Sequence, residues 1–358
     1  MDDSGNYFLD LRRQKGLKIV SGIRGAGKTL HLLKFREMLL SEGVESSRIL
    51  YLDADSPELR RCSTCEQVIN FVENSLPHDG VSYILIREAG SLADAEIVLG
   101  TLSALSRCDI YLTLSTRHIL THGLGKYLAG AMSVLEIPPP DLGPLTTEQG
   151  QALWYTIFVK DVLSPLRILD ACLVSRIAGY LSDHLGDPIS LRQVAMAVSP
   201  SGRLISPHTS AGYLEALADA HLIEKAIRFD LTEDAPQATR YCYFFTSLEL
   251  RHAQFGSAPE HEAERINANK AWLQLRRNYG TVYIASGSER STSSPAARTA
   301  KRPIGTWDRV GASASVLTTS SPTDTKGATA ASTGGLSPCS FLKKSSSGTK
   351  WSRNCGRK

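Results

Sequence analysis

The residues with the clearest chemical meaning lie between Gly22 and Thr29 and read Gly-Ile-Arg-Gly-Ala-Gly-Lys-Thr. They match the pattern G-x-x-x-x-G-K-[ST], in which backbone N–H groups surround phosphate oxygens at the start of a helix. In such a loop Lys28 reaches the β- and γ-phosphates, and the Thr29 hydroxyl holds Mg²⁺. The sequence therefore predicts ATP and Mg²⁺ as ligands, with nucleotide contacts from Gly22, Arg24, Gly25, Ala26, Gly27, Lys28 and Thr29.

The segments on either side of this loop are the ones that the pattern requires. The apolar run 17–21 is typical of a buried strand, and residues 30–40 carry leucines and a phenylalanine at the spacing of an amphipathic helix. A strand, a glycine loop and a helix in this order favour phosphate binding over the alternative, a glycine-rich turn without a ligand.

Hydrolysis needs more than the loop, because an aspartate must orient Mg²⁺ and a neighbouring glutamate must polarise the attacking water. The predicted strand 81–86 is followed by Arg87 and Glu88. Glu88 is the candidate catalytic carboxylate, but Arg87 stands where the aspartate is needed. An arginine repels a metal ion, although it can contact a phosphate directly. Asp53 and Asp55 follow an earlier strand, which we expect at the edge of the sheet, so they do not replace the missing acid.

These motifs resemble the prokaryotic P-loop ATPases of the AAA class that carry a C-terminal domain of unknown function. The loop of that family reads G-[IV]-R-R-x-G-K-[ST], and its later strand ends in Leu-Asp-Glu, where this chain has Ile86-Arg87-Glu88. A further strand end corresponds to Leu114-Ser115-Thr116, and the family's following arginine is Ala131 here. The resemblance covers residues 5–285 and implies the fold and ATP binding, in a degenerate member with weak or absent hydrolysis.

Length and composition bound the class of protein. A chain of 358 residues exceeds one typical domain, and it contains no apolar run of eighteen residues, so no membrane span is expected. The N-terminus lacks a basic and apolar leader, and seven scattered cysteines do not describe a disulfide framework. We therefore expect a cytoplasmic protein.

The charge is unevenly distributed. Residues 291–358 carry a net charge of +9. Since the whole chain carries +4, the net charge of the preceding residues is −5. The part expected to fold is therefore mildly acidic, which does not favour nucleic-acid binding.

The periodicity predicts an α/β domain over residues 1–140, a P-loop NTPase fold with a parallel sheet. Its expected strands are 17–21, 48–53, 81–86, 109–115 and 133–137, and its expected helices lie near 28–41, 65–75 and 93–106. Three prolines at 138–140 end this domain, and residues 141–165 form a linker.

Residues 166–250 predict a winged-helix domain. Three helices, the third beginning at Ser206, precede two strands at 223–231 and 239–245. This order allows the alternative function, a DNA-binding regulatory protein with a vestigial loop. We expect Glu215 and Asp219 on the exposed face of the third helix, where they would repel DNA phosphates, so a packing role is favoured. No protein partner can be deduced.

The C-terminal part predicts a truncated domain and a disordered tail. Residues 251–285 resemble the start of the family's nuclease-like module, whereas residues 286–358 are rich in Ser and Thr and lack apolar periodicity. Residues 289–296 admit codons that, with the reading frame shifted by one base, give Glu-Ile-Asp-Phe-Val-Ala-Gly, which resembles the nuclease-like signature due there. A frameshift that replaced the last domain explains both observations.

Overall fold

The computed structural model describes residues 6–124, 132–138, 142–199, 205–230, 235–256, 262–278, 281–286, 308–309, 315–319 and 340–342. These residues form two compact units, which we describe separately. Unit 1 comprises the described residues within 1–145, 151–169 and 219–222, and unit 2 comprises those within 146–150, 170–218 and 223–358.

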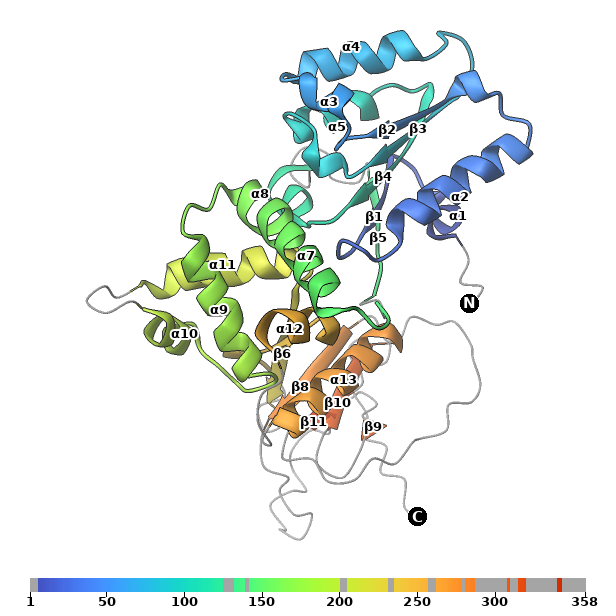
Figure 1. Cartoon of the computed structure of the whole chain (residues 1–358). Coiled ribbons are helices and arrows are strands. Elements are labelled where there is room, and N and C mark those ends of the chain that lie inside the picture. The colour runs from blue at the N-terminus through green and yellow to red at the C-terminus, as the bar shows by residue number, and fades with distance from the viewer. Residues whose placement is uncertain are drawn as a thin grey trace. The chain divides into compact units, whose positions relative to one another are not determined.

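Unit 1 is built on a parallel sheet with strand order β2-β3-β4-β1-β5 (Figure 1). Its strands are β1 (Leu17–Ser21), β2 (Ile49–Asp53), β3 (Ser82–Arg87), β4 (Cys108–Leu114) and β5 (Met132–Glu136). The strand that precedes the glycine loop, β1, is therefore flanked by β4 and β5, and β2 lies at the edge as expected. The predicted α/β class and parallel sheet are confirmed.

Helices cover both faces of this sheet, as a parallel sheet requires. The helices of unit 1 that precede its last strand are α1 (Tyr7–Leu11), α2 (Lys28–Ser41), α3 (Pro57–Arg61), α4 (Cys65–Ser75) and α5 (Ala95–Ser103). Short turns of 3₁₀ or π type are η1 (Ser46–Arg48), η2 (Ala89–Ser91) and η3 (Ile119–Leu124).

Successive strand residues point to opposite faces and so belong to different cores. In β4, Ile110 and Leu112 pack with α4 and α5, whereas Tyr111 between them packs with Phe8 of α1 and Phe35 of α2. Tyr111 and Phe35 have ring centroids 4.4 Å apart. This alternation fixes the register that brings the ends of β1, β3 and β4 to one edge.

The segment predicted as a linker, residues 141–165, differs from that expectation. It contains α7 (Thr147–Ile157), the π-helical turn η4 (Phe158–Leu163) and the start of α8 (Ser164–Leu166). Trp154 and Ile157 are almost fully buried. Residues 151–169 belong to unit 1, and residues 146–150 belong to unit 2.

Unit 2 contains the helices and strands expected for residues 166–250. They are α9 (Ala171–Asp183), α10 (Leu191–Val198), α11 (Pro207–Asp219), β6 (Ile223–Asp230) and β7 (Ala235–Phe245). Side-chain caps begin two of the helices, since Asp170 accepts from the Leu173 N–H and Ser190 forms a capping box with Gln193. Asp219, expected to be exposed, is only 7% exposed, whereas Glu215 is exposed.

The predicted boundary at residue 250 does not separate two compact units. After β7 follow α12 (Leu248–Phe255), α13 (Glu262–Asn278) and β8 (Thr281–Ser286), and β8 pairs in parallel with β6. The buried side chain of Asn269 on α13 forms two hydrogen bonds with the backbone of Phe245. Its Oδ1 accepts from the Phe245 N–H at 2.8 Å, and its Nδ2 donates to the Phe245 carbonyl oxygen at 2.9 Å. Trp272 of α13 stacks on Phe244 of β7 at 4.8 Å. The hairpin β6–β7 thus shares its core with residues 262–286.

The predicted disordered tail falls mostly on residues outside the described ranges. Within it the structure describes the short strands β9 (Asp308–Arg309), β10 (Ser315–Thr319) and β11 (Ser340–Leu342). Strands β10 and β11 pair antiparallel with β8.

Candidate functional site

The loop between β1 and α2 has a backbone that depends on glycine. Gly25 and Gly27 have φ of +93° and +81°, the left-handed region that other residues rarely adopt. A Cβ on Gly22 would lie 3.2 Å from the Cβ of Ile137. Gly27 is the N-cap of α2 and supplies no side chain to cap the first N–H groups of the helix. The loop therefore turns tightly into an uncapped helix N-terminus, which suits an anion.

Lys28 lies buried against this loop, only 3% exposed. Its Nζ donates to the carbonyl oxygens of Gly22 and Ile23 at 2.7 and 2.9 Å and to Ser115 Oγ at 3.0 Å. Burial lowers the pKa of Lys28 to about 8, although the carboxylate of Glu88 opposes this effect. The ammonium group thus has neutral oxygen acceptors and no carboxylate among these direct partners.

Glu88 connects the end of β3 to this lysine through Ser115. The Ser115 hydroxyl donates to Glu88 Oε1 at 2.8 Å, and the backbone N–H of Glu88 donates to Thr113 Oγ1 at 2.9 Å. Glu88 is 6% exposed and has a φ of +51°, a conformation that costs energy for a residue other than glycine. Its second oxygen, Oε2, lies 3.4 Å from Arg24 Nη2. Both oxygens of the candidate catalytic carboxylate are therefore engaged.

Arg24, the third residue of the loop, is held by carboxylates. Its Nε and Nη2 donate to the two oxygens of Asp161 at 2.8 Å each, and its Nη1 lies 3.7 Å from Asp55 Oδ2. Burial opposes the charge of Arg24, but these hydrogen bonds and the nearby negative charges raise its pKa overall. Burial raises the pKa of Asp161, although Arg24 opposes this rise. The pair is bidentate, which fixes the orientation of the guanidinium.

Arg87 occupies the position next to Thr29. Its Nη1 donates to both oxygens of Asp53 at 2.6 and 2.7 Å, and its Nε donates to Thr29 Oγ1 at 3.3 Å. Burial opposes the charge of Arg87, but the Asp53 hydrogen bond raises its pKa overall. The hydroxyl predicted to bind Mg²⁺ therefore accepts a hydrogen bond from a guanidinium.

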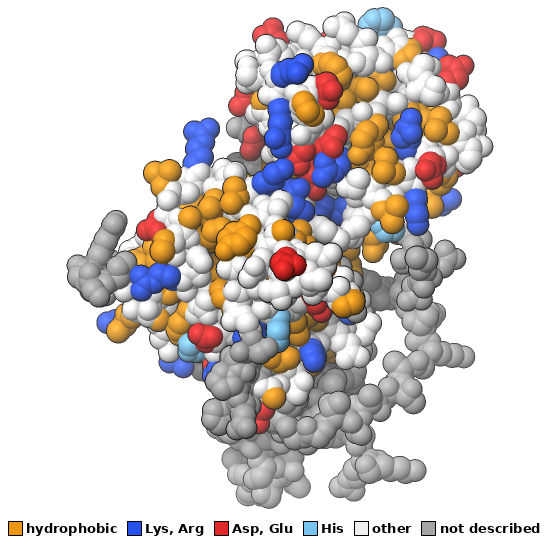
Figure 2. Space-filling model, viewed as in Figure 1, with side chains coloured by type: hydrophobic (Ala, Val, Ile, Leu, Met, Phe, Trp, Pro, Cys, Tyr) orange, Lys and Arg blue, Asp and Glu red, His pale blue; other side chains and the backbone are white. Residues whose placement is uncertain are grey.

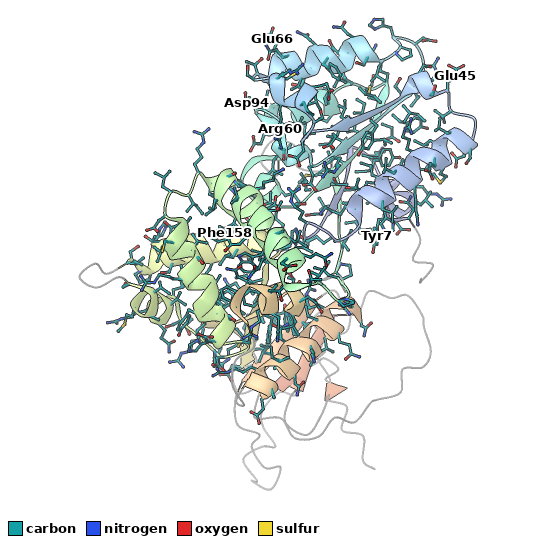
Figure 3. All side chains as sticks on the ribbon, viewed as in Figure 1. Tyr7, Glu45, Arg60, Glu66, Asp94 and Phe158 are labelled. Atoms are coloured by element: carbon teal, nitrogen blue, oxygen red, sulfur yellow. The ribbon has the colours of Figure 1, made fainter. Side chains whose placement is uncertain are left out.

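Further charges surround Asp55, which follows β2. Lys160 Nζ and Arg60 Nη2 each lie 3.1 Å from Asp55 Oδ1. Burial acts to raise the pKa of Asp55, but the hydrogen bonds from Lys160 and Arg60 lower it overall. Figure 3 labels Arg60 on α3 and Phe158, which begins η4. In Figure 2, acidic and basic side chains gather in the middle of the face shown.

The structure thus brings the loop, Glu88 and Arg87 together, and it adds residues that the sequence analysis missed. Lys160 and Asp161 come from the segment taken as a linker. Their signal in the sequence is a Lys-Asp pair inside the otherwise apolar run 157–163. They lie on a π-helical turn, which often marks a functional position in a helix. Residues 128–131, which carry the proposed counterpart of the family's arginine, lie outside the described residues.

The part of the chain that the structure describes contains no cluster of three or more His, Cys, Asp or Glu placed to hold a metal. Cys62 and Cys65 are half-buried free thiols. Among the described residues, no helix is both long and apolar enough to cross a membrane.

The first part of the chain is similar to a known protein family. Residues 14–143 match the family model described as an AAA domain. An uncharacterized protein of Haemophilus influenzae is 22% identical over 315 residues, which span 76% of this chain and 78% of that protein.

Two solved structures show weaker similarity. The Aeropyrum pernix ORC1 protein in complex with DNA is 10% identical, with 68% of this chain and 87% of that chain covered and a TM-score of 0.27. A DNA replication initiation factor is 14% identical, with 75% and 89% covered and a TM-score of 0.29. TM-scores this low carry no argument about fold or ligand. The first part of the chain, residues 14–143, is therefore similar to an AAA domain.

Proposed function

We propose that this protein binds ATP or ADP through the loop Gly22–Thr29 and hydrolyses ATP weakly or not at all. The observation that carries the proposal is the combination of the glycine turn, the uncapped N-terminus of α2 and the buried ammonium group of Lys28. Backbone N–H groups and a lysine at a helix start bind phosphate whatever the rest of the ligand is.

The contacts of Lys28 support a ligand rather than a purely structural role. A buried ammonium group is costly unless a negative charge compensates it. Lys28 instead donates to two carbonyls and one hydroxyl, and its pKa is lowered to about 8. A phosphate in the loop would supply the missing negative charge and could take over hydrogen bonds that Lys28 now gives to the backbone.

The contacts of Arg87 and Glu88 support weak hydrolysis. Metal-assisted hydrolysis needs an acid on the metal and a carboxylate free to accept a hydrogen bond from water. Here Arg87 stands where the acid on the metal is needed and is bonded to Asp53 and Thr29, while the Glu88 carboxylate is shared between Ser115 and Arg24. The site can therefore hold phosphates more readily than it can activate water.

The direct test is nucleotide binding by the Lys28→Ala variant. We expect ATP and ADP affinity to fall about 100-fold or more, because the charge-assisted contact to the phosphates is lost. Lys34→Ala is the matched control, since Lys34 lies exposed on the same helix. Titration calorimetry on all three proteins measures the difference. Equal affinity in the wild type and the Lys28→Ala variant would disprove the proposal.

The alternative, a winged-helix DNA-binding protein with a vestigial loop, predicts a different pattern. Its DNA affinity would be independent of Lys28, and neither ATP nor ADP would bind. We do not favour it, because the exposed Glu215 on α11 faces solvent where DNA phosphates would have to approach that helix.

A further inference from the structure

Arg87 is held as a fixed positive charge at the place where a metal ion is expected. Two hydrogen bonds from Nη1 to Asp53, at 2.6 and 2.7 Å, anchor one edge of its guanidinium, and Nε lies 3.3 Å from Thr29 Oγ1. Thr29 is the second residue of α2, directly after Lys28. The guanidinium therefore stands beside the helix N-terminus that would hold the phosphates.

The residues at this place do not fit Mg²⁺. The ion takes oxygen ligands at about 2.0–2.1 Å in a near-octahedral arrangement, with one or two carboxylates from the protein. The Thr29 hydroxyl accepts a hydrogen bond from Arg87, and both oxygens of Asp53 accept from the same guanidinium. Asp55 is shared by Arg24, Arg60 and Lys160. An ion placed here would have to displace one cation and approach others.

Charge arithmetic points the same way. In an ordinary site of this kind an aspartate and one Mg²⁺ together carry a net charge of +1 beside the nucleotide. Burial opposes the charge of Arg87, but the Asp53 hydrogen bond raises its pKa, so it stays protonated and position 87 contributes the same +1, while its partner Asp53 contributes −1. The substitution of arginine for the acid thus removes the metal ligand and places a fixed cation beside Thr29, where the metal ion is expected.

We infer that Arg87 takes the place of Mg²⁺, so that nucleotide polyphosphate binds without a metal ion. The inference rests on the proposed function, since it concerns the same loop. Lys28 and the backbone N–H groups hold the phosphates, and Arg87, fixed by Asp53, neutralises the phosphate charge that Mg²⁺ usually neutralises.

The experiment measures ADP and ATP affinity of the full-length protein in excess Mg²⁺ and in EDTA. The wild type should bind equally well in both, within about twofold. Binding in Mg²⁺ but not in EDTA would overturn the inference and leave the proposed function intact. Binding in neither condition would overturn the proposed function itself, and with it the inference.

Variants of Arg87 sharpen the result. Arg87→Asp should lose about tenfold or more in EDTA and recover in Mg²⁺, because Asp53, Thr29 and the new carboxylate then form an oxygen-rich site. Arg87→Gln should lose affinity in both conditions, because it brings neither charge nor a carboxylate. Arg13→Asp is the matched control, since it makes the same charge change at an exposed position between α1 and β1 and should bind like the wild type.

Folding of each variant is checked by its thermal melting curve. If Arg87→Asp does not fold, Arg87→Gln still decides, since unchanged affinity of that variant in EDTA would contradict a role for the Arg87 charge.

Discussion

A lysine is buried at each end of the parallel sheet in unit 1, and the two lysines differ in the groups that accept their hydrogen bonds. At the N-terminal ends of β1 and β4, Lys18 pairs directly with Asp109, and the other oxygen of Asp109 accepts from the Tyr111 hydroxyl at 2.8 Å. At the C-terminal ends, Lys28 donates to two backbone carbonyls and to Ser115, at 2.7 to 3.0 Å. Lys18 therefore contacts a carboxylate directly, whereas the hydrogen bonds of Lys28 go to neutral oxygens.

The difference separates a structural ion pair from a ligand site. Lys18 sits over the ring of Tyr111 at 5.2 Å and completes a closed set of contacts within the sheet. Lys28 is held by neutral acceptors, and burial lowers its pKa to about 8. A buried ammonium group without a directly bonded carboxylate is costly, and such groups are typical of sites where a negatively charged ligand binds.

Removal of Lys18 should cost the most stability. Lys18→Met leaves Asp109 without its cationic partner, and breaking a fully buried pair costs about 3–5 kcal/mol. The Asp109 side chain is 25% exposed, so we expect a smaller loss, about 2 kcal/mol. Urea denaturation measures the free energy of unfolding, and ADP titration should show unchanged affinity.

The double variant Lys18→Met, Asp109→Leu serves as the control for this loss. It removes both charges, so it should regain part of the stability. If Lys18→Met lowered nucleotide affinity as strongly as Lys28→Ala, the distinction between the two ends of the sheet would fail.

The rate of ATP hydrolysis tests the site at the C-terminal ends of the strands, where Lys28 and Arg87 lie. The wild type should turn over ATP well below about 1 s⁻¹, the low end of ordinary enzyme rates. Arg87→Asp should raise the Mg²⁺-dependent rate about tenfold, about 1.4 kcal/mol in the barrier, because a carboxylate can then orient the metal. Phosphate release measures the rate.

Glu88 provides the control for that gain. In the Arg87→Asp background, Glu88→Gln should abolish the increase, because the amide cannot polarise water as a carboxylate does. A gain that survives Glu88→Gln would show that Glu88 is not the water-polarising group. An ordinary rate in the wild type would show that the metal-orienting acid lies elsewhere.

The sequence predicted the strands of unit 1 to within a residue or two, because a parallel sheet buried on both faces leaves strong apolar runs. β1, for example, is predicted and observed at 17–21. The helices α1 and α3 were missed because each has only five residues, too few to show a helical period.

The site itself was only partly predictable. The loop and Glu88 lie in short contiguous motifs, whereas Asp161 reaches Arg24 across 137 positions of the chain. Asp161 contributes to the site only because α7 and η4 fold as helices with buried residues. The three prolines before this segment led us to expect a linker there instead. Likewise, Asp53 was correctly placed at the end of an edge strand, but its register opposite Arg87 follows only from the strand pairing.

A further buried base lies at the same edge of the sheet. His221, in the short segment 219–222 that belongs to unit 1, has Nε2 3.0 Å from the Oγ of Ser21, the last residue of β1. Burial lowers the pKa of His221 well below its usual value of 6.5, and the charges of Arg117 and Lys28 act in the same direction. Above pH 6.5, His221 is therefore neutral in the folded protein and adds no second positive charge near Lys28.

The pH dependence of stability tests this assignment and is the smallest effect we expect. Between the lowered pKa of the folded state and 6.5, the unfolded chain binds the proton and the folded chain does not, so the free energy of unfolding falls as the pH falls. From pH 6.5 to 5.5 the loss from His221 should be about 1 kcal/mol. The comparison is with His221→Asn, because asparagine tolerates the φ of +55° at this position and does not titrate. Urea denaturation at both pH values should show the wild type losing about 1 kcal/mol more than the variant. Parallel losses in the two proteins would mean that His221 is already charged when folded, and Lys28 would then share its edge of the sheet with a second buried cation.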